Sequence, residues 1–261
     1  MTTEPTTVAV LGTGEAGSAL VADLLAAGAV VRAYDPAVAA PEGTVACSDE
    51  ADAVSGADLV LSVNSSADSL TAATNAAPGL REGVVWAEAN SSSPSRKREV
   101  AGALPAHVLV ADLALMSTVP GQGIRVPMTA SGPGAGRAAE LLGPLGATVA
   151  VVDGPIGDAA ARKLLRSVFF KGLAAAVVES LEAARAAGLE DETHAEIARE
   201  LERAGATTVE RLVSGSIRHA VRRAHEMSAA AEMLDDLGVP PRVARASERW
   251  LEDLAARRDQ A

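Results

Sequence analysis

The chain has 261 residues, a formal net charge of −11, 48% hydrophobic residues and a single cysteine. The negative charge argues against nucleic acid or an anionic membrane as a partner, and a lone cysteine excludes an intrachain disulfide and a cysteine metal site. The first residues show no secretory signal, and no apolar run reaches the roughly 20 residues of a membrane span, so we expect a soluble cytoplasmic protein without a bound metal.

The first half of the sequence alternates strand and helix patterns. Short apolar runs predict strands at 7–11, 29–34, 58–63, 84–87, 107–113, 126–131 and 147–153. Helical patterns are found at 18–27, 51–57, 69–77 and 94–104, and a further short helix opens after residues 131–134. This alternation is typical of an α/β sheet covered by helices. We therefore predict a sheet of about eight strands.

A glycine motif directly follows the first strand. Its six residues are Gly12, Thr13, Gly14, Glu15, Ala16 and Gly17. In a G-x-G-x-x-G turn the first glycine permits a tight turn, the second lets the backbone approach a pyrophosphate, and the third lets the helix lie close to the strand. Asp35 ends the second strand, close to the spacing of about 20 residues expected for an acidic ribose ligand. The motif therefore predicts a dinucleotide site, with a glycine-rich turn that binds no ligand as the alternative.

The nature of the dinucleotide depends on two side chains. Asp35 can accept hydrogen bonds from two ribose hydroxyls, and its charge would repel a 2′-phosphate, which favours NAD. Arg32 stands two residues earlier, and an arginine there could favour the phosphate of NADP. We predict NAD and leave NADP open.

Two polar loops follow strands of this sheet. Ligands of open α/β sheets bind beyond the carboxyl ends of the strands, so the loops 64–66 and 90–93 are expected over the cofactor or substrate, although short polar residues also form ordinary turns. The residues assigned to the cofactor here are Val63, Asn64, Ser65 and Asn90. The basic run 96–98 in the next helix is interpreted as a solvated helix face.

A helical pattern of about thirty residues begins after the turn at 154–157 and ends at Gly188. Such a helix is roughly 45 Å long and usually joins two parts of a molecule. We therefore predict a Rossmann-type dinucleotide-binding domain, 1–153, followed by an all-helical domain, 154–261, that starts with this long helix. Lys163 lies on its largely apolar surface, and a lysine that reaches solvent at a domain border is the structural alternative to a catalytic one.

Only helices are predicted after this point. They span 191–204, 206–213, 216–237 and 242–256, with Gly205, Gly215 and residues 238–241 between them. The segment 218–227 carries two histidines and three arginines. It is either a solvated basic face or a substrate or cofactor contact, and the residue pattern leaves both open.

Three features in fixed order resemble the β-hydroxyacid dehydrogenase superfamily, which includes 6-phosphogluconate and 3-hydroxyisobutyrate dehydrogenases. They are V-L-G-T-G-E-A-G near the start, G-P-I-G-D-A-A-A-R-K-L-L-R-S in the middle and the all-helical end. The family's motif G-x-x-G-x-G-x-x-x-K-x-x-x-N falls on Gly154, Gly157, Ala159, Lys163 and Ser167, so the lysine is kept while the third glycine and the asparagine are replaced. The end of the chain looks like an uncharacterised branch with a 6-phosphogluconate-dehydrogenase-like C-terminal domain.

The resemblance implies an NAD(P)-dependent oxidoreductase that transfers hydride between a nicotinamide and a small β-hydroxy acid or similar alcohol. It assigns Lys163 as the general acid/base, and it aligns His225 with a family lysine near the cofactor. The substrate contacts assigned in this way are Asn90, Ser91, Met116, Ser117, Thr118 and Ser167. Lys171 and Arg222 are candidates for binding an anionic group of a small-molecule substrate.

Two other functions are compatible with the same sequence features. A related imine or ketone reductase would share the fold, and a dinucleotide-binding regulatory protein would share the cofactor site without turnover. In each case we expect a homodimer formed through the helical domain, because that domain alone would leave much apolar surface exposed.

Overall fold

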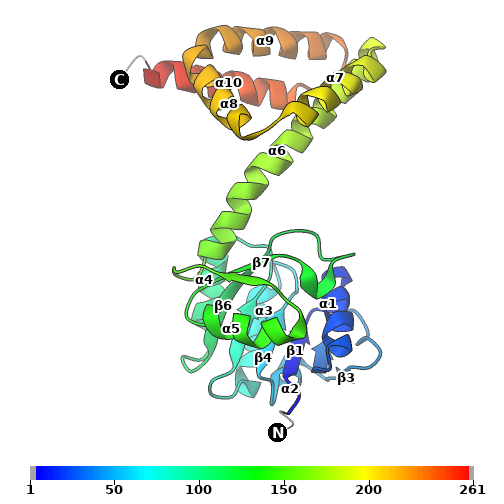
Figure 1. Cartoon of the computed structure of the whole chain (residues 1–261), viewed down its shortest axis with the longest axis vertical. Coiled ribbons are helices and arrows are strands. Elements are labelled where there is room, and N and C mark those ends of the chain that lie inside the picture. The colour runs from blue at the N-terminus through cyan, green and yellow to red at the C-terminus, as the bar shows by residue number, and fades with distance from the viewer. Residues whose placement is uncertain (1–3, 259–261) are drawn as a thin grey trace. The chain divides into compact units, whose positions relative to one another are not determined.

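The computed structural model describes residues 4–258 (Figure 1). The chain divides into two compact units, one that ends at Arg166 and one that begins at Ser167. This division falls inside a single helix, α6 (Asp158–Ala187). The domain border that we placed between residues 153 and 154 lies just before that helix, within the first unit.

The described part of the first unit contains one sheet with the strand order β3-β2-β1-β4-β5-β6-β7-β8. The strands are β1 (Thr7–Leu11), β2 (Val30–Tyr34), β3 (Val45–Ala46), β4 (Leu59–Ser62), β5 (Val85–Glu88), β6 (Leu109–Leu115), β7 (Met128–Ser131) and β8 (Val149–Val151). All neighbouring strands are parallel except β6 and β7. The predicted α/β sheet is confirmed, and β3 was not located because two residues show no periodicity.

Helices cover both faces of this sheet. On one face are α1 (Glu15–Ala26) and α5 (Ala135–Leu142), and on the other are α2 (Glu50–Val54), α3 (Ser69–Ala76) and α4 (Pro94–Ala103). Short 3-10 turns lie at Ala77–Gly79, Gly123–Arg125 and Gly143–Leu145. Successive residues of β1 enter opposite cores, with Val8 and Val10 in one and Ala9 and Leu11 in the other. A strand covered on both sides is therefore apolar throughout.

The helix α1 begins earlier than predicted, at Glu15 instead of Ser18. The glycine motif does not delay the helix, because Gly17 lies inside its first turn. A Cβ atom at Gly17 would stand 1.9 Å from the carbonyl oxygen of Gly12. Glycine is thus present for the close approach of α1 to the end of β1, as the motif predicts.

The second unit is all-helical in its described residues. Besides the rest of α6 it contains α7 (Glu190–Arg203), α8 (Ala206–Arg218), α9 (Ala220–Asp236) and α10 (Arg242–Arg258). The predicted break at Gly215 was wrong, since α8 continues to Arg218. Glycine in a helix interior costs only about 1 kcal/mol relative to alanine. Here it leaves room for the Arg223 side chain, whose Nη1 donates to Ser216 Oγ at 3.0 Å.

Packing within this unit is uneven. The helices α9 and α10 lie side by side (Figure 1), and Ala231 and Leu234 of α9 are buried. The carboxylate of Glu179 in α6 accepts the backbone N–H groups of Val243 and Ala244 at 2.7 and 2.8 Å, which caps the start of α10. By contrast, no described residue of α7 or α8 is buried.

Candidate functional site

A cavity of about 680 Å³ lies at the carboxyl ends of β1, β2 and β4. From β1 the chain continues to β2 and β3 on one side of the sheet and then returns to β4 on the other side. Open α/β sheets bind ligands at such a change in strand order. The lining includes eight residues that we assigned to the cofactor, namely Gly12, Gly14, Glu15, Ala16, Asp35, Val63, Asn64 and Ser65. The structure therefore brings the glycine motif, the acidic residue after β2 and the loop after β4 to one place.

The glycine loop has room for a bound diphosphate. Gly12 has a φ of +96°, and a Cβ there would lie 2.6 Å from the carbonyl oxygen of Val63. At Gly14, by contrast, a Cβ would meet no protein atom within 4 Å, and no side chain caps α1. The N–H groups of the first turn can therefore bind an anion. Thr13 Oγ1 is buried beside them and has no hydrogen-bond partner within residues 4–258.

Asp35 ties the loop after β2 to the glycine loop. Its Oδ2 accepts the N–H of Thr13 at 2.8 Å, and its Oδ1 accepts those of Ala37 and Val38 at 2.9 and 3.0 Å. Two carboxylate oxygens offer about four lone pairs, so capacity remains for a ribose hydroxyl. Asp35 thus lines the cavity, and its role at the ribose stays a prediction.

Arg32 is directed away from this cavity. Its guanidinium donates to the carbonyl oxygen of Ala53 at 3.1 Å and to both the carbonyl oxygen and Oδ1 of Asp52 at 2.7 Å. The pKa of Asp52 is lowered, first by the backbone hydrogen bond from Ser48 and further by Arg32. Arg32, the residue that made NADP a possible cofactor in the sequence, therefore forms its hydrogen bonds with α2.

The electrostatic character of the cavity is acidic. Carboxylates line it at Glu15, Asp35, Glu50 and Asp68. Among the residues that the structure describes, no lysine, arginine or histidine contributes to the lining. An additional phosphate on the ribose would meet negative charge there without a compensating cation.

Lys163 contacts the loop that follows β5. Its Nζ donates to Ser91 Oγ at 2.7 Å. One turn further along α6, Arg166 Nη1 donates to the carbonyl oxygen of Met116 at 2.9 Å. Three residues expected at the substrate, Lys163, Ser91 and Met116, thus lie at one end of α6. Arg166 was not predicted, although its spacing of three residues from Lys163 places it on the same helix face.

The segment after Met116 is a polar loop. The exposed side chain of Ser117 accepts Gln122 Nε2 at 3.1 Å, and the carbonyl oxygen of Thr118 accepts the same nitrogen at 3.0 Å. These bonds hold the loop without using the hydroxyl group of Thr118. The role of both residues at a substrate stays a prediction.

Asn90 is the centre of a buried polar network. Its Nδ2 donates to Glu88 Oε1 at 2.7 Å and to Ser62 Oγ at 3.1 Å, and Ser62 Oγ donates to Asn64 Oδ1 at 2.8 Å. Trp86 Nε1 donates to the other oxygen of Glu88 at 3.2 Å. The loops after β4 and β5 are therefore held together, while Asn90 Oδ1 is buried and has no partner within residues 4–258.

The interpretation of residues 96–98 as a solvated face was wrong for Lys97. This side chain is 1% exposed, and its Nζ lies 3.1 Å from Oδ1 of Asp112, which is 0% exposed. Lys97 shares the inner face of α4 with Val100, three residues further on. A buried lysine requires a charged partner. That partner comes from β6, the strand that follows α4 in the chain, and no local pattern reveals the pair.

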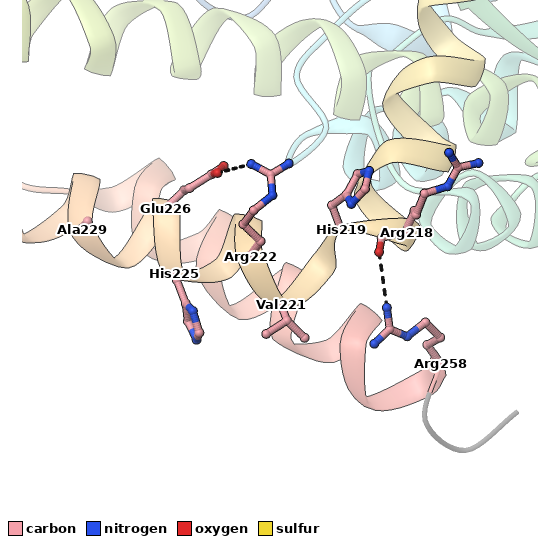
Figure 2. A pocket seen from close by; sticks show the side chains of 8 residues that line it. All are labelled: Arg218, His219, Val221, Arg222, His225, Glu226, Ala229 and Arg258. Carbon is pink, nitrogen blue, oxygen red and sulfur yellow. Dashed lines mark hydrogen bonds and ion pairs between the residues drawn. The ribbon is translucent and has the colours of Figure 1, made fainter.

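Four of the predicted contacts belong to the second unit, namely Ser167, Lys171, Arg222 and His225, and their roles stay predictions. Arg222 and His225 line an open hollow together with Arg218, His219 and Arg258 (Figure 2). Arg222 forms an ion pair with Glu226, and Figure 2 shows the His225 ring extending from α9 in the opposite direction. The basic groups therefore do not converge on one point.

The described residues offer neither a cluster of metal ligands nor a membrane-spanning helix. Residues 4–258 contain no group of three or more metal-ligating side chains placed to hold an ion. In the same range, no helix is long and apolar enough to cross a membrane.

Both units match known sequence families. Residues 7–111 match the NAD binding domain of 6-phosphogluconate dehydrogenase, and residues 184–254 match a domain of unknown function, DUF1932. A conserved hypothetical protein from Sinorhizobium meliloti 1021 is 30% identical, with 95% of this chain and 87% of that chain covered and a TM-score of 0.62. The chain belongs to this 6-phosphogluconate dehydrogenase-like, DUF1932-containing family.

Other similar structures extend the comparison. A conserved protein of unknown function, described as structurally similar to 3-hydroxyacid dehydrogenases, is 28% identical over 95% of this chain and 97% of its own, with a TM-score of 0.62. An imine reductase from Streptomyces aurantiacus is 19% identical over 95% of this chain and 94% of its own, with a TM-score of 0.75, a likeness that concerns the fold alone. Among curated proteins, none matches this sequence. As a member of this family, the protein has an NAD-binding domain in its first unit. It is therefore of the NAD(P)-dependent oxidoreductase type.

Proposed function

We propose that the protein transfers hydride between NAD and a carbon that bears a hydroxyl group, in a small β-hydroxy acid or a similar alcohol. The observation that supports this most is the contact of Lys163 Nζ with Ser91 Oγ. Ser91 follows β5 at the edge of the sheet where β1 carries the glycine loop, so a proton-transferring amine is held at the end of the sheet that binds the cofactor.

The cofactor and the protein are proposed to have different roles in the reaction. A bound nicotinamide dinucleotide supplies the hydride chemistry, and the chain supplies binding, orientation and proton transfer. The glycine loop and the start of α1 bind the diphosphate, and Asp35 binds the adjacent ribose. Asn90 Oδ1 offers a buried acceptor to a ligand N–H or O–H group. Lys163 takes the proton of the substrate hydroxyl in oxidation and returns it in reduction.

The substrate is proposed to be small and to carry an anionic group. Lys171 and Arg222 are the cations proposed for that group, with Met116, Ser117, Thr118 and Ser167 as further contacts. Because structurally similar proteins include imine reductases, cyclic imines and ketones belong in the same screen as hydroxy acids. Turnover of imines alone would replace the alcohol proposal. Dinucleotide binding without turnover of any compound would point to a regulatory role.

NADH is expected to bind more tightly than NADPH, by at least about tenfold, or 1.4 kcal/mol. The acidic lining repels a 2′-phosphate, and Arg32 is engaged by Asp52. Titration calorimetry with each reduced cofactor measures the ratio. In Asp35→Ser the ratio should fall, because one of the repelling carboxylates is removed. Tighter binding of NADPH by the wild type would contradict this assignment.

We also propose that the helical unit forms a homodimer. Its apolar side chains are widely exposed, with Val168 at 74%, Val209 at 63% and Leu212 at 52%. Large exposed apolar surfaces mark interaction sites, and a two-fold dimer is the commonest way to cover them.

Light scattering on the wild type is expected to give the mass of a dimer. Leu212→Glu should raise the dissociation constant at least about tenfold, the effect of losing one well-buried interface residue. Val151→Glu, at an equally exposed position in the first unit (52%), serves as the control. A wild type that is monomeric at micromolar concentration would remove this proposal.

A further inference from the structure

The start of α6 is capped by side chains from the sheet. Asp112 Oδ2, in the middle of β6, accepts the N–H of Gly157 at 3.1 Å and that of Ala160 at 2.8 Å. Ser131 Oγ, at the end of β7, accepts the N–H of Ala159 at 3.0 Å. The first N–H groups of a helix have no partner within the helix. Two strands therefore satisfy three of these groups and fix where α6 begins.

Lys97 connects this cap to the loop that contains Ser91. Its Nζ lies 3.1 Å from Asp112 Oδ1 and also donates to the carbonyl oxygen of Glu88, the last residue of β5. Ser91 follows Glu88 in the next loop and accepts the hydrogen bond of Lys163. The two partners of the Lys163–Ser91 contact are thus each attached to the same buried ion pair, one through α6 and one through β5.

Stability alone is a weak explanation for this pair. Taking two charges out of water is costly, and replacing a buried pair by apolar residues is often neutral or stabilising. However, the Asp112 carboxylate makes directed hydrogen bonds to the start of α6, and the Lys97 ammonium makes one to the carbonyl oxygen of Glu88. The Asp112 oxygen therefore fixes the start of α6, and Lys97 serves as the buried counter-ion of this carboxylate.

We infer that Asp112 is a positioning residue, whose side-chain oxygen places Lys163 against Ser91 by capping α6. The importance of this cap for catalysis rests on the proposed function of Lys163. The hydrogen bonds that form the cap are independent of that function. The cap lies six residues or fewer before Lys163, less than two helical turns, so a shift of the first turn moves the amine directly.

The lysine content of the chain allows a direct test. The sequence contains only three lysines, Lys97, Lys163 and Lys171. In protein labelled with ¹³C and ¹⁵N at lysine, each side chain gives a resolved NMR signal, and single Lys→Met variants assign them. Two double variants are compared, K97M/D112N and K97M/D112A. Both remove the ion pair, and they differ in whether an oxygen remains to accept the N–H groups of α6.

We expect K97M/D112N to keep the Lys163 signal of the wild type. In K97M/D112A the Lys163 signal should move towards that of the exposed Lys171. Amide exchange at Gly157 and Ala160 should rise about tenfold or more, as expected when buried donors lose their acceptor. A folded K97M/D112A with an unchanged Lys163 signal would overturn the inference, as would equal shifts of that signal in both double variants.

Ser131→Ala provides a milder variant should K97M/D112A fail to fold. It removes only the acceptor of Ala159 N. A smaller shift of the Lys163 signal in the same direction would support the inference, and faster exchange at Ala159 with no shift of that signal would overturn it. These signals need no substrate. If the proposed role of Lys163 in alcohol oxidation is wrong, Lys163→Met will keep near-normal turnover, and these spectra will be unaffected.

Discussion

Replacing Lys163 with methionine is expected to lower kcat by about 10²–10⁴-fold, the usual contribution of a general acid or base. Methionine keeps much of the apolar length of the side chain and removes the amine that bonds to Ser91. The glycine loop and Asp35 are untouched, so the affinity for NADH should stay within about twofold, or 0.4 kcal/mol. Turnover is followed by the absorbance of the reduced cofactor, with the first hydroxy acid, ketone or imine that the screen identifies.

Arg162→Met is the matched control for this variant. Arg162 is an exposed cation on the same helix, one residue before Lys163, and it lies on another side of α6. We expect its kcat to equal that of the wild type. Near-normal turnover by Lys163→Met would show that another group or a water molecule transfers the proton.

Gly17→Ala is expected to abolish dinucleotide binding and to lower the free energy of unfolding by about 1–3 kcal/mol, the common cost of overpacking. The new Cβ would stand 1.9 Å from the carbonyl oxygen of Gly12, a backbone atom that cannot rotate away. Either α1 or the turn after β1 must therefore shift. Both elements form the proposed diphosphate site.

Gly14→Ala separates binding from folding. A Cβ at this position meets no protein atom within 4 Å, so the melting temperature should stay close to that of the wild type while NADH affinity falls. Gly136→Ala, in α5, is equally open and should affect neither property adversely. Calorimetry and thermal unfolding measure the two effects. Normal NADH binding by Gly14→Ala would place the diphosphate away from the glycine loop.

The sequence predicted the sheet because its signals are local. Strand, turn and helix follow one another between Thr7 and Ala26, where Gly12 has a φ of +96° and a Cβ at Gly17 would meet the carbonyl oxygen of Gly12. The break assigned to Gly215 failed because a packing contact with Arg223 outweighs the weak local preference of glycine. Local chemistry determines where most elements lie, and tertiary contacts determine where some of them end.

The candidate site was predictable only in part. Lys163 and Ser91 were named through the family resemblance, and the structure brings them into contact, while their roles stay predictions. Lys97 was interpreted as a solvated residue because its sequence neighbours are basic. Its partner Asp112 comes from a strand on the other side of a loop, so neither residue alone indicates the pair. Such pairs depend on strand order, which a single sequence does not specify.

The cap on α6 also limits how freely this protein can be recombined in evolution or by design. A gene fragment that starts at Ser167 would encode the second unit without the first turns of its leading helix, and one that starts at Gly154 would still lack Asp112 and Ser131. A helical module transferred to another dinucleotide-binding domain would need an equivalent acid and hydroxyl on the new sheet. The two halves are compact by themselves, yet the first turn of the helix that links them depends on strands of the first half for its hydrogen bonds.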